Sequence, residues 1–118
     1  MSPDHLFVYG TLRKGSNNQF ARLLDEQSQF IAVARSSGRL YDFGRYPGAR
    51  PANDSVVGEI FHIDESLLAV LDDYEGPEFE RAIVSAQIDD GRVFDCWIYW
   101  YVGAETGRLI ASGDWFRR

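Results

Sequence analysis

The chain has 118 residues, of which 45% are hydrophobic and 25% charged, and its net charge is −6. This length and composition are those of one globular domain in water, which we place at residues 1–118. The acidic balance argues against nucleic acid or anionic membrane as a partner, because like charges repel. The first residues lack a signal peptide's features, and no segment has the ~20 apolar residues that span a bilayer, so we expect a cytoplasmic protein.

The few cysteine and histidine residues exclude further classes of site. Cys96 is the only cysteine, so an intrachain disulfide is impossible, and its apolar surroundings predict a small buried side chain. His5 and His62 are too few and too isolated for a dedicated zinc site. We therefore predict no bound metal. Separately, we expect a monomer or a weak homodimer.

The N-terminal half begins with a strand and a helix. Residues 6–9 are continuously apolar, which is typical of a short strand buried on both faces. Residues 10–18 have the composition of a loop, and Asn18 is expected to cap a helix over residues 19–26.

A strand and a long loop are predicted next. Residues 31–40 indicate a strand that is interrupted near residues 36–38. Residues 41–54 are rich in Gly, Pro and polar side chains, so we predict a long irregular loop there.

A second strand and a second helix follow. Residues 56–63 alternate, with Val57 and Glu59 on one face and Val56 and Ile60 on the other. Asp64 is expected to cap the helix that ends at residue 75.

The C-terminal half predicts a hairpin. Residues 81–88 and 92–102 read as two strands joined by the turn Asp89-Asp90-Gly91. Strands outnumber helices and the elements alternate irregularly. We therefore predict an α+β fold, a small mixed, barrel-like sheet with two or three flanking helices.

A carboxyl group stands at the end of the second helix, beside its apolar stripe. The stripe consists of Leu67, Leu68, Val70, Leu71 and Tyr74. At ~100° per residue, Glu75 lies about 70° from the centre of this stripe, whereas Asp72 and Asp73 lie about 130° away and face water. Gly76 and Pro77 end the helix. An acid against apolar surface is a candidate proton carrier, and the alternative is a helix-end acid bound to local backbone.

Other charged residues offer competing interpretations. Glu59 lies among apolar side chains of its strand, and we expect it to pair with an arginine such as Arg81 rather than to act in catalysis. Arg81 is then this structural partner or, alternatively, an anchor for a substrate carboxylate. Glu78 and Glu80 follow a proline in a loop and are expected to be solvated.

The loop between Gly10 and Gly15 directly follows a buried strand. Its backbone N–H groups, helped by Arg13 and Lys14, can form a cradle for an anion. The alternative is a plain turn between strand and helix with exposed basic residues.

Aromatic residues near the C-terminus have two interpretations. Tyr99 and Tyr101 can line a small-molecule cavity, because a phenol combines apolar area with a polar tip, or they can pack in the core. Trp115 is expected to anchor the C-terminus to the body of the domain, without a chemical role.

Several segments together resemble one known family. They are FVYGTLRKG at residues 7–15, VGEIF at 57–61, LDDYEG at 71–76 and FER at 79–81. In this order they resemble the gamma-glutamylcyclotransferase-like family. The YGTL segment is similar to the gamma-glutamylamine cyclotransferase branch, and residues 46–48 and 112–115 are similar to small bacterial members.

The resemblance implies a fold, a reaction and a site. The family fold is a mixed, barrel-like sheet with flanking helices. Its catalytic acid falls on Glu75, and its substrate loop falls on Tyr9, Gly10, Thr11 and Leu12. The family reaction converts a γ-glutamyl amide into 5-oxoproline and a free amine by attack of the substrate's own α-amine, with the acid carrying the proton. It needs no cofactor or metal.

Two alternatives remain open at this level. One is a ligand-binding module that keeps the same pocket without turnover. The other is an enzyme that removes a γ-glutamyl protecting group in a biosynthetic pathway. The short chain has little room for the extra elements of the longer animal enzymes, so the leaving amine stays undetermined.

Overall fold

The structure is a computed structural model that describes residues 2–118. This part of the chain forms six strands, two α-helices and a short 3-10 helix. They are β1 His5–Val8, α1 Gln19–Gln27, β2 Gln29–Asp42, β3 Pro47–His62, α2 Glu65–Glu75, β4 Phe79–Ile88, β5 Val93–Tyr101, β6 Arg108–Leu109 and η1 Trp115–Arg117. None of the helices in this part of the chain has the length and apolar character that crossing a membrane requires.

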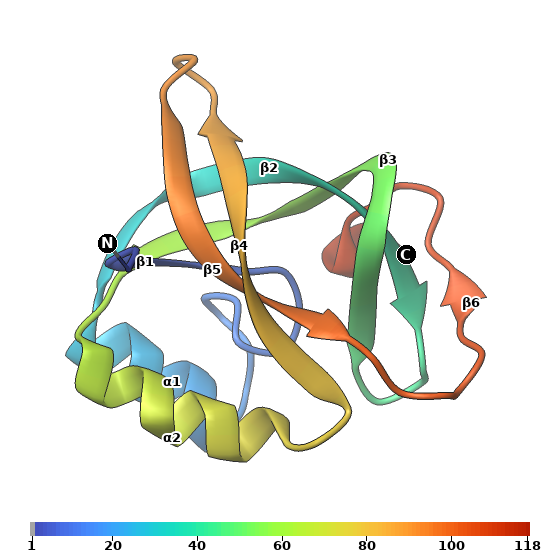
Figure 1. Ribbon diagram of the computed structural model, residues 1–118, viewed down its shortest axis with the longest axis horizontal. Coiled ribbons are helices and arrows are strands. Elements are labelled where there is room, and N and C mark those ends of the chain that lie inside the picture. The colour runs from blue at the N-terminus through green and yellow to red at the C-terminus, as the bar shows by residue number, and fades with distance from the viewer. Residues whose placement is uncertain (1) are drawn as a thin grey trace.

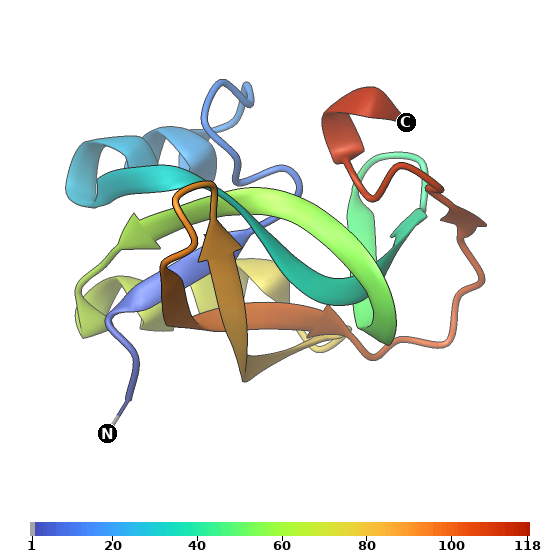
Figure 2. The same cartoon turned by 90° about the horizontal axis from the view of Figure 1, so that it is seen from above.

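Five strands close into a barrel. β1 pairs with β3, β3 with β2, β2 with β4 and β4 with β5, all antiparallel. A parallel pairing between Leu6 of β1 and Trp97 of β5 completes the ring. The helices α1 and α2 lie together on one side of this barrel (Figure 1, Figure 2). The predicted α+β class, with a mixed, barrel-like sheet and flanking helices, is therefore confirmed.

The sheet separates two apolar clusters. One fills the barrel and contains Phe7, Val56 and Ile60, all at most 1% exposed. The other lies between the sheet and the helices and contains Leu24, Phe61, Leu67 and Leu71, together with further apolar residues. Successive side chains of a strand point to opposite faces, so the alternation predicted along β3 places its residues in different clusters.

The helix ends show which capping predictions are correct. Asn18 caps α1, because its Oδ1 accepts a hydrogen bond from the Ala21 N–H at 2.8 Å. Asp64 occupies the N-cap position of α2, but its side chain makes no capping hydrogen bond, contrary to the prediction. Gly76 ends α2 with a φ of 77°, a conformation that favours glycine.

The predicted long loop at residues 41–54 is wrong. β2 runs to Asp42 and β3 starts at Pro47, so residues 43–46 are only the turn of a long hairpin. Pro47 starts its strand, and Pro51 falls where the register shifts, positions at which a strand tolerates a residue without an N–H. Pairing with β2 therefore overrides the loop-like composition.

Candidate functional site

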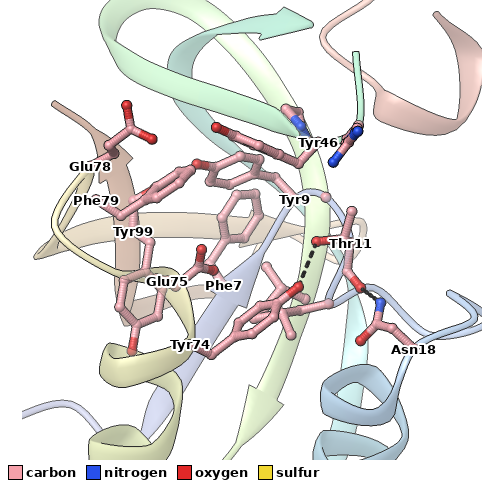
Figure 3. A pocket seen from close by; sticks show the side chains of 15 residues that line it. Phe7, Tyr9, Thr11, Asn18, Tyr46, Tyr74, Glu75, Glu78, Phe79 and Tyr99 are labelled. Atoms are coloured by element: carbon pink, nitrogen blue, oxygen red, sulfur yellow. Dashed lines mark hydrogen bonds between the residues drawn. The ribbon is translucent and has the colours of Figure 1, made fainter. Parts of the chain in front are cut away.

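A cavity of about 400 Å³ opens where β1, the β2–β3 turn and the end of α2 meet (Figure 3). Its walls are formed by residues from five parts of the chain. They are Phe7, Val8, Tyr9, Gly10, Thr11, Leu12, Asn18, Arg45, Tyr46, Pro47, Tyr74, Glu75, Glu78, Phe79 and Tyr99. The cavity thus brings together all five residues that the resemblance assigns to the site, Glu75 and the segment 9–12.

Glu75 is the last residue of α2, and its carboxyl group points into the cavity (Figure 3). Burial raises the pKa of this carboxyl from 4.5 to about 7, because a charged carboxylate loses hydration against apolar walls. Asp72 and Asp73, on the same turn, are exposed as predicted. A group with a pKa near neutrality can both accept and return a proton at physiological pH.

The segment after β1 lines the cavity with Gly10, Thr11 and Leu12. Within residues 2–118, the N–H groups of Gly10, Thr11 and Leu12 donate no hydrogen bond to another backbone or side-chain group. The segment is held in place by Asn18, whose Nδ2 donates to the Thr11 carbonyl at 2.7 Å. The Thr11 hydroxyl lies 3.4 Å from the hydroxyl of Tyr74 on α2. These donors can bind an oxygen that carries negative charge.

Gly10 lies against the β2–β3 turn. A Cβ atom at this position would stand 2.8 Å from Cδ of Pro47 and still closer to Cγ, which is inside contact distance. The small residue therefore allows the turn to close over the segment, so that Tyr46 and Pro47 become walls of the cavity.

Tyr9 has its ring in the cavity wall, but its hydroxyl is used by the protein. This hydroxyl donates to the Tyr99 carbonyl at 2.6 Å and accepts from the Ala49 N–H at 3.1 Å. Burial raises the pKa of the phenol well above its usual value. The Tyr9 hydroxyl therefore joins β1 to two other strands and leaves only the ring to face a ligand.

Arg13 matches neither of the two predicted alternatives, a helper of an anion cradle or an exposed basic residue on a plain turn. Its side chain is buried, and it donates from Nε to Glu59 at 3.0 Å and from Nη1 to Asp114 at 2.8 Å. Glu59 also accepts from the Lys14 N–H at 2.7 Å. The Lys14 side chain points outward to Asp25, 3.5 Å away. The prediction that Glu59 pairs with an arginine is thus confirmed, with Arg13 in place of Arg81.

Arg81 pairs with Asp72 instead of Glu59. Its Nε and Nη2 donate to the two carboxyl oxygens of Asp72 at 2.9 and 3.1 Å. Asp72 also accepts from the Tyr99 hydroxyl at 2.7 Å. Arg81 is absent from the cavity walls, because this carboxylate and the face of Trp97 hold its guanidinium elsewhere.

The remaining side chains that the sequence singled out lie either in the cavity wall or in the core. Tyr99 lines the cavity, whereas Tyr101 is buried and its hydroxyl donates a hydrogen bond to Glu78 at 3.3 Å. Glu78 is exposed, as predicted, but it also lines the cavity. Trp115 packs into the barrel cluster, in agreement with the predicted anchor at the C-terminus.

Arg45, Tyr46 and Phe79 line the cavity, although no sequence pattern assigned them to the site. Arg45 and Tyr46 lie in the turn that was predicted as part of a long loop, and Phe79 starts β4. The Tyr-Pro-Gly motif at residues 46–48 was the only signal that pointed to this turn.

The residues that often hold metal ions are dispersed. Across residues 2–118, no three His, Cys, Asp or Glu side chains form a group that could hold a metal ion. Cys96 is buried in the barrel, and burial raises the pKa of its thiol to about 12. It has the character of the small buried residue that was predicted.

Residues 6–117 match the family described as gamma-glutamyl cyclotransferase, AIG2-like. The chain is 36% identical to the gamma-glutamylcyclotransferase family protein YtfP of Escherichia coli, over 96% of both chains, and 40% identical to a Vibrio cholerae relative over the same shares. The solution structure of Escherichia coli YtfP covers 94% of this chain and 95% of its own, with a TM-score of 0.70 at 35% identity. Gamma-L-glutamyl-butirosin B gamma-glutamyl cyclotransferase from Niallia circulans is 34% identical, over 82% of this chain and 66% of the relative. The names of the family and of these relatives indicate gamma-glutamylcyclotransferase activity. The chain belongs to the gamma-glutamyl cyclotransferase, AIG2-like family.

Proposed function

We propose that this protein converts a γ-glutamyl amide into 5-oxoproline and a free amine, with Glu75 as the general acid and base. One observation carries the proposal. A carboxyl group whose pKa is raised to about 7 shares a small cavity with Gly10, Thr11 and Leu12, whose backbone N–H groups have no acceptor within residues 2–118. The family membership and the names of the relatives support the same reaction.

The chemistry needs one proton carrier. Ionised Glu75 takes a proton from the substrate's α-ammonium, and the freed amine attacks the γ-carbonyl carbon of the same molecule. The tetrahedral intermediate collapses when protonated Glu75 returns the proton to the departing nitrogen, which leaves as an amine. The attacking nitrogen, now in the ring, gives its remaining excess proton to this amine, which is released as an ammonium ion. Nucleophile and carbonyl arrive in one molecule, so the cavity contributes mainly by holding the glutamyl unit folded.

The segment 10–12 stabilises the negative charge that develops. When the amine attacks, the γ-carbonyl oxygen becomes an oxyanion, and preformed N–H donors bind it more strongly than they bind the ground-state carbonyl. The N–H groups of this segment have no hydrogen-bond acceptor within residues 2–118, and the residues that carry them line the cavity. They are the donors that we assign to this role.

The test is turnover of a panel of γ-glutamyl amines and dipeptides, with 5-oxoproline detected by mass spectrometry. Glu75→Gln is expected to keep the fold and to lose about 10²–10⁴-fold in kcat/KM, the usual scale for a general acid–base group. Near-full activity of this variant would remove Glu75 from the mechanism. Binding of 5-oxoproline without turnover of any panel member would favour a ligand-binding module.

One relative favours a second candidate, the removal of a γ-glutamyl group in biosynthesis. The Niallia circulans protein carries gamma-L-glutamyl-butirosin B in its name, and it is 34% identical to this chain. The chemistry is the same, and only the leaving amine differs. Preference for a large γ-glutamylated amine over small ones in the panel would support this candidate.

A further inference from the structure

Arg45 is the one cationic side chain in the wall of the cavity. Among the cavity-lining residues that the structure describes, it is the only Arg, Lys or His. Arg45 is exposed, and no acidic group within residues 2–118 forms an ion pair with it. The other basic residues near the segment 10–12 are engaged elsewhere, since Arg13 pairs with Glu59 and Lys14 faces Asp25.

The β2–β3 turn that carries Arg45 is held in a defined conformation. Asp42 accepts a hydrogen bond from the Gly44 N–H at 2.7 Å, and the Phe43 N–H donates to the Tyr46 carbonyl at 3.1 Å. The Phe43 ring packs on Tyr101 with centroids 4.3 Å apart. The backbone of Arg45 is therefore positioned before any ligand arrives, which lowers the entropy cost of using its guanidinium.

The turn also touches the part of the cavity where the glutamyl unit is expected. Pro47, two residues after Arg45, lies directly against Gly10. The two acids of the cavity, Glu75 and Glu78, come from the end of α2 and the loop after it, whereas the cation comes from the turn. An α-amino acid carries its ammonium and its carboxylate on one carbon. A cavity that offers an acid from one element and a cation from another matches this pair of charges.

We infer that Arg45 binds the α-carboxylate of the γ-glutamyl substrate. This inference rests on the proposed function and divides the work within the site. Arg45 holds the carboxylate, Glu75 faces the α-amine, and the N–H groups of the segment 10–12 bind the carbonyl oxygen. A guanidinium suits this task, because its planar fork can donate two hydrogen bonds to one carboxylate.

A matched pair of substrates isolates the carboxylate. γ-Glutamyl-n-butylamide and 4-amino-N-butylbutanamide share the reacting amine, the carbonyl and the leaving n-butylamine, but the second lacks the α-carboxylate and closes to 2-pyrrolidinone. Arg45→Gln should raise KM for the first substrate by about 10-fold, the scale of a hydrogen bond to a charged group. Its kinetics on the second should equal those of the unmodified protein, because no carboxylate is there to lose.

Two further variants serve as controls. Arg45→Lys keeps the charge and should restore part of the affinity for γ-glutamyl-n-butylamide. Arg92→Gln removes a similarly exposed arginine from the tip of the β4–β5 hairpin, far from the cavity, and should change neither substrate (Figure 1). Equal melting temperatures of the variants would show that the change in KM is not a loss of fold.

Two results would overturn the inference. One is an equal effect of Arg45→Gln on both substrates. The other is an effect confined to γ-glutamyl-4-aminobutyrate, whose second carboxylate lies on the leaving amine, because Arg45 would then recognise the leaving group instead.

Calorimetric titration separates this inference from the proposed function. Arg45→Gln should weaken binding of 5-oxoproline, which keeps the α-carboxylate, by about the same 10-fold. Loss of that binding in a protein that turns over none of the γ-glutamyl amides would refute the reaction and support carboxylate recognition by Arg45. Unchanged binding of 5-oxoproline in the variant would refute the role of Arg45, whatever the turnover.

Discussion

Arg13 and Glu59 form a buried ion pair at the residue that follows the cavity-lining segment 10–12, with Arg13 Nε 3.0 Å from Glu59 Oε2. Glu59 accepts a second hydrogen bond from the Lys14 N–H, and Arg13 donates a second one to Asp114 near the C-terminus. The turn after Leu12 is thus tied to β3 and to the C-terminal segment. The charges of this pair serve the architecture of the site and are not available to a substrate.

Glu59→Gln should lower the free energy of unfolding by about 3 kcal/mol, because removing one charge of a buried pair leaves the other poorly compensated. Asp114 still holds one arm of Arg13, which limits the loss. Urea unfolding measures the change. The control is Asp54→Asn in the exposed pair with Arg39, where the loss should be much smaller, because water screens the two charges. Equal effects of the two substitutions would contradict the structural role of Glu59.

Gly10→Ala should damage both stability and turnover. The added methyl group meets the rigid ring of Pro47, so either the β2–β3 turn or the segment 10–12 has to move. Such overpacking costs about 1–3 kcal/mol. Thermal unfolding and 5-oxoproline release measure the two effects. Gly91→Ala is the control and should lower stability without changing turnover. Its positive φ disfavours alanine, but the added Cβ meets no atom within 4 Å and the turn is remote from the cavity. Full activity of the Gly10 variant would show that the contact with Pro47 does not shape the site.

The pH dependence of kcat/KM should reveal Glu75. The reaction requires the carboxylate form, and burial places the pKa of Glu75 at about 7. We therefore expect kcat/KM to fall about tenfold for each pH unit below 7 and to level off above it. The residual activity of Glu75→Gln should lack this acidic limb. A limb centred near 4.5 in the unmodified protein would mean that Glu75 is not desolvated in the working enzyme.

Glu75 should also make the fold less stable as the pH rises. Its pKa is about 7 when folded and 4.5 when unfolded, so between these values the folded state binds the proton more tightly. The contribution of Glu75 to stability is therefore largest below pH 4.5 and falls by up to about 3 kcal/mol as the pH rises through 7. Glu75→Gln removes this loss and should be more stable than the unmodified protein at pH 8, with little difference at pH 4.5.

Urea unfolding at pH 4.5 and pH 8 measures how the stability difference between Glu75→Gln and the unmodified protein changes with pH. Glu80→Gln, an exposed acid on β4, serves as the control and should show the same difference from the unmodified protein at both values. A Glu75 variant that is less stable at pH 8 would show that the charged carboxylate is stabilised in the fold by a contact that the neutral amide cannot replace.

Much of the local structure could be predicted from the sequence, because its determinants lie within a few residues of one another. The alternation along β3, the cap at Asn18 and the turn at residues 89–91 each depend on neighbouring side chains and backbone. The position of Glu75 at the rim of an apolar stripe follows from helical spacing in the same way. These features therefore appear in the structure where they were predicted.

Partner choice could not be predicted, because it depends on which distant segments the closed barrel brings together. Glu59 lies in the interior near Arg13 rather than Arg81, and Arg81 reaches Asp72. Residues 43–46 have a loop-like composition, yet the register of β2 on β3 turns them into a short, fixed corner over Gly10. Strand pairing across such distances is not encoded in local composition.

The sequence alone thus determined the class of fold, the helix that presents Glu75 and the segment 9–12 that lies beside it in the cavity. Only the tertiary structure decided that the Arg13 side chain is buried in ion pairs away from the cavity, and that the Tyr9 hydroxyl is already hydrogen-bonded within the protein. It also decided that the β2–β3 turn brings Arg45 and Tyr46 into the cavity wall. The physical reason is the range of the interactions. The spacing of apolar residues and the helix caps depend on residues a few positions apart in the sequence. The shape and charge of the cavity depend on distant segments that the closure of the barrel brings together.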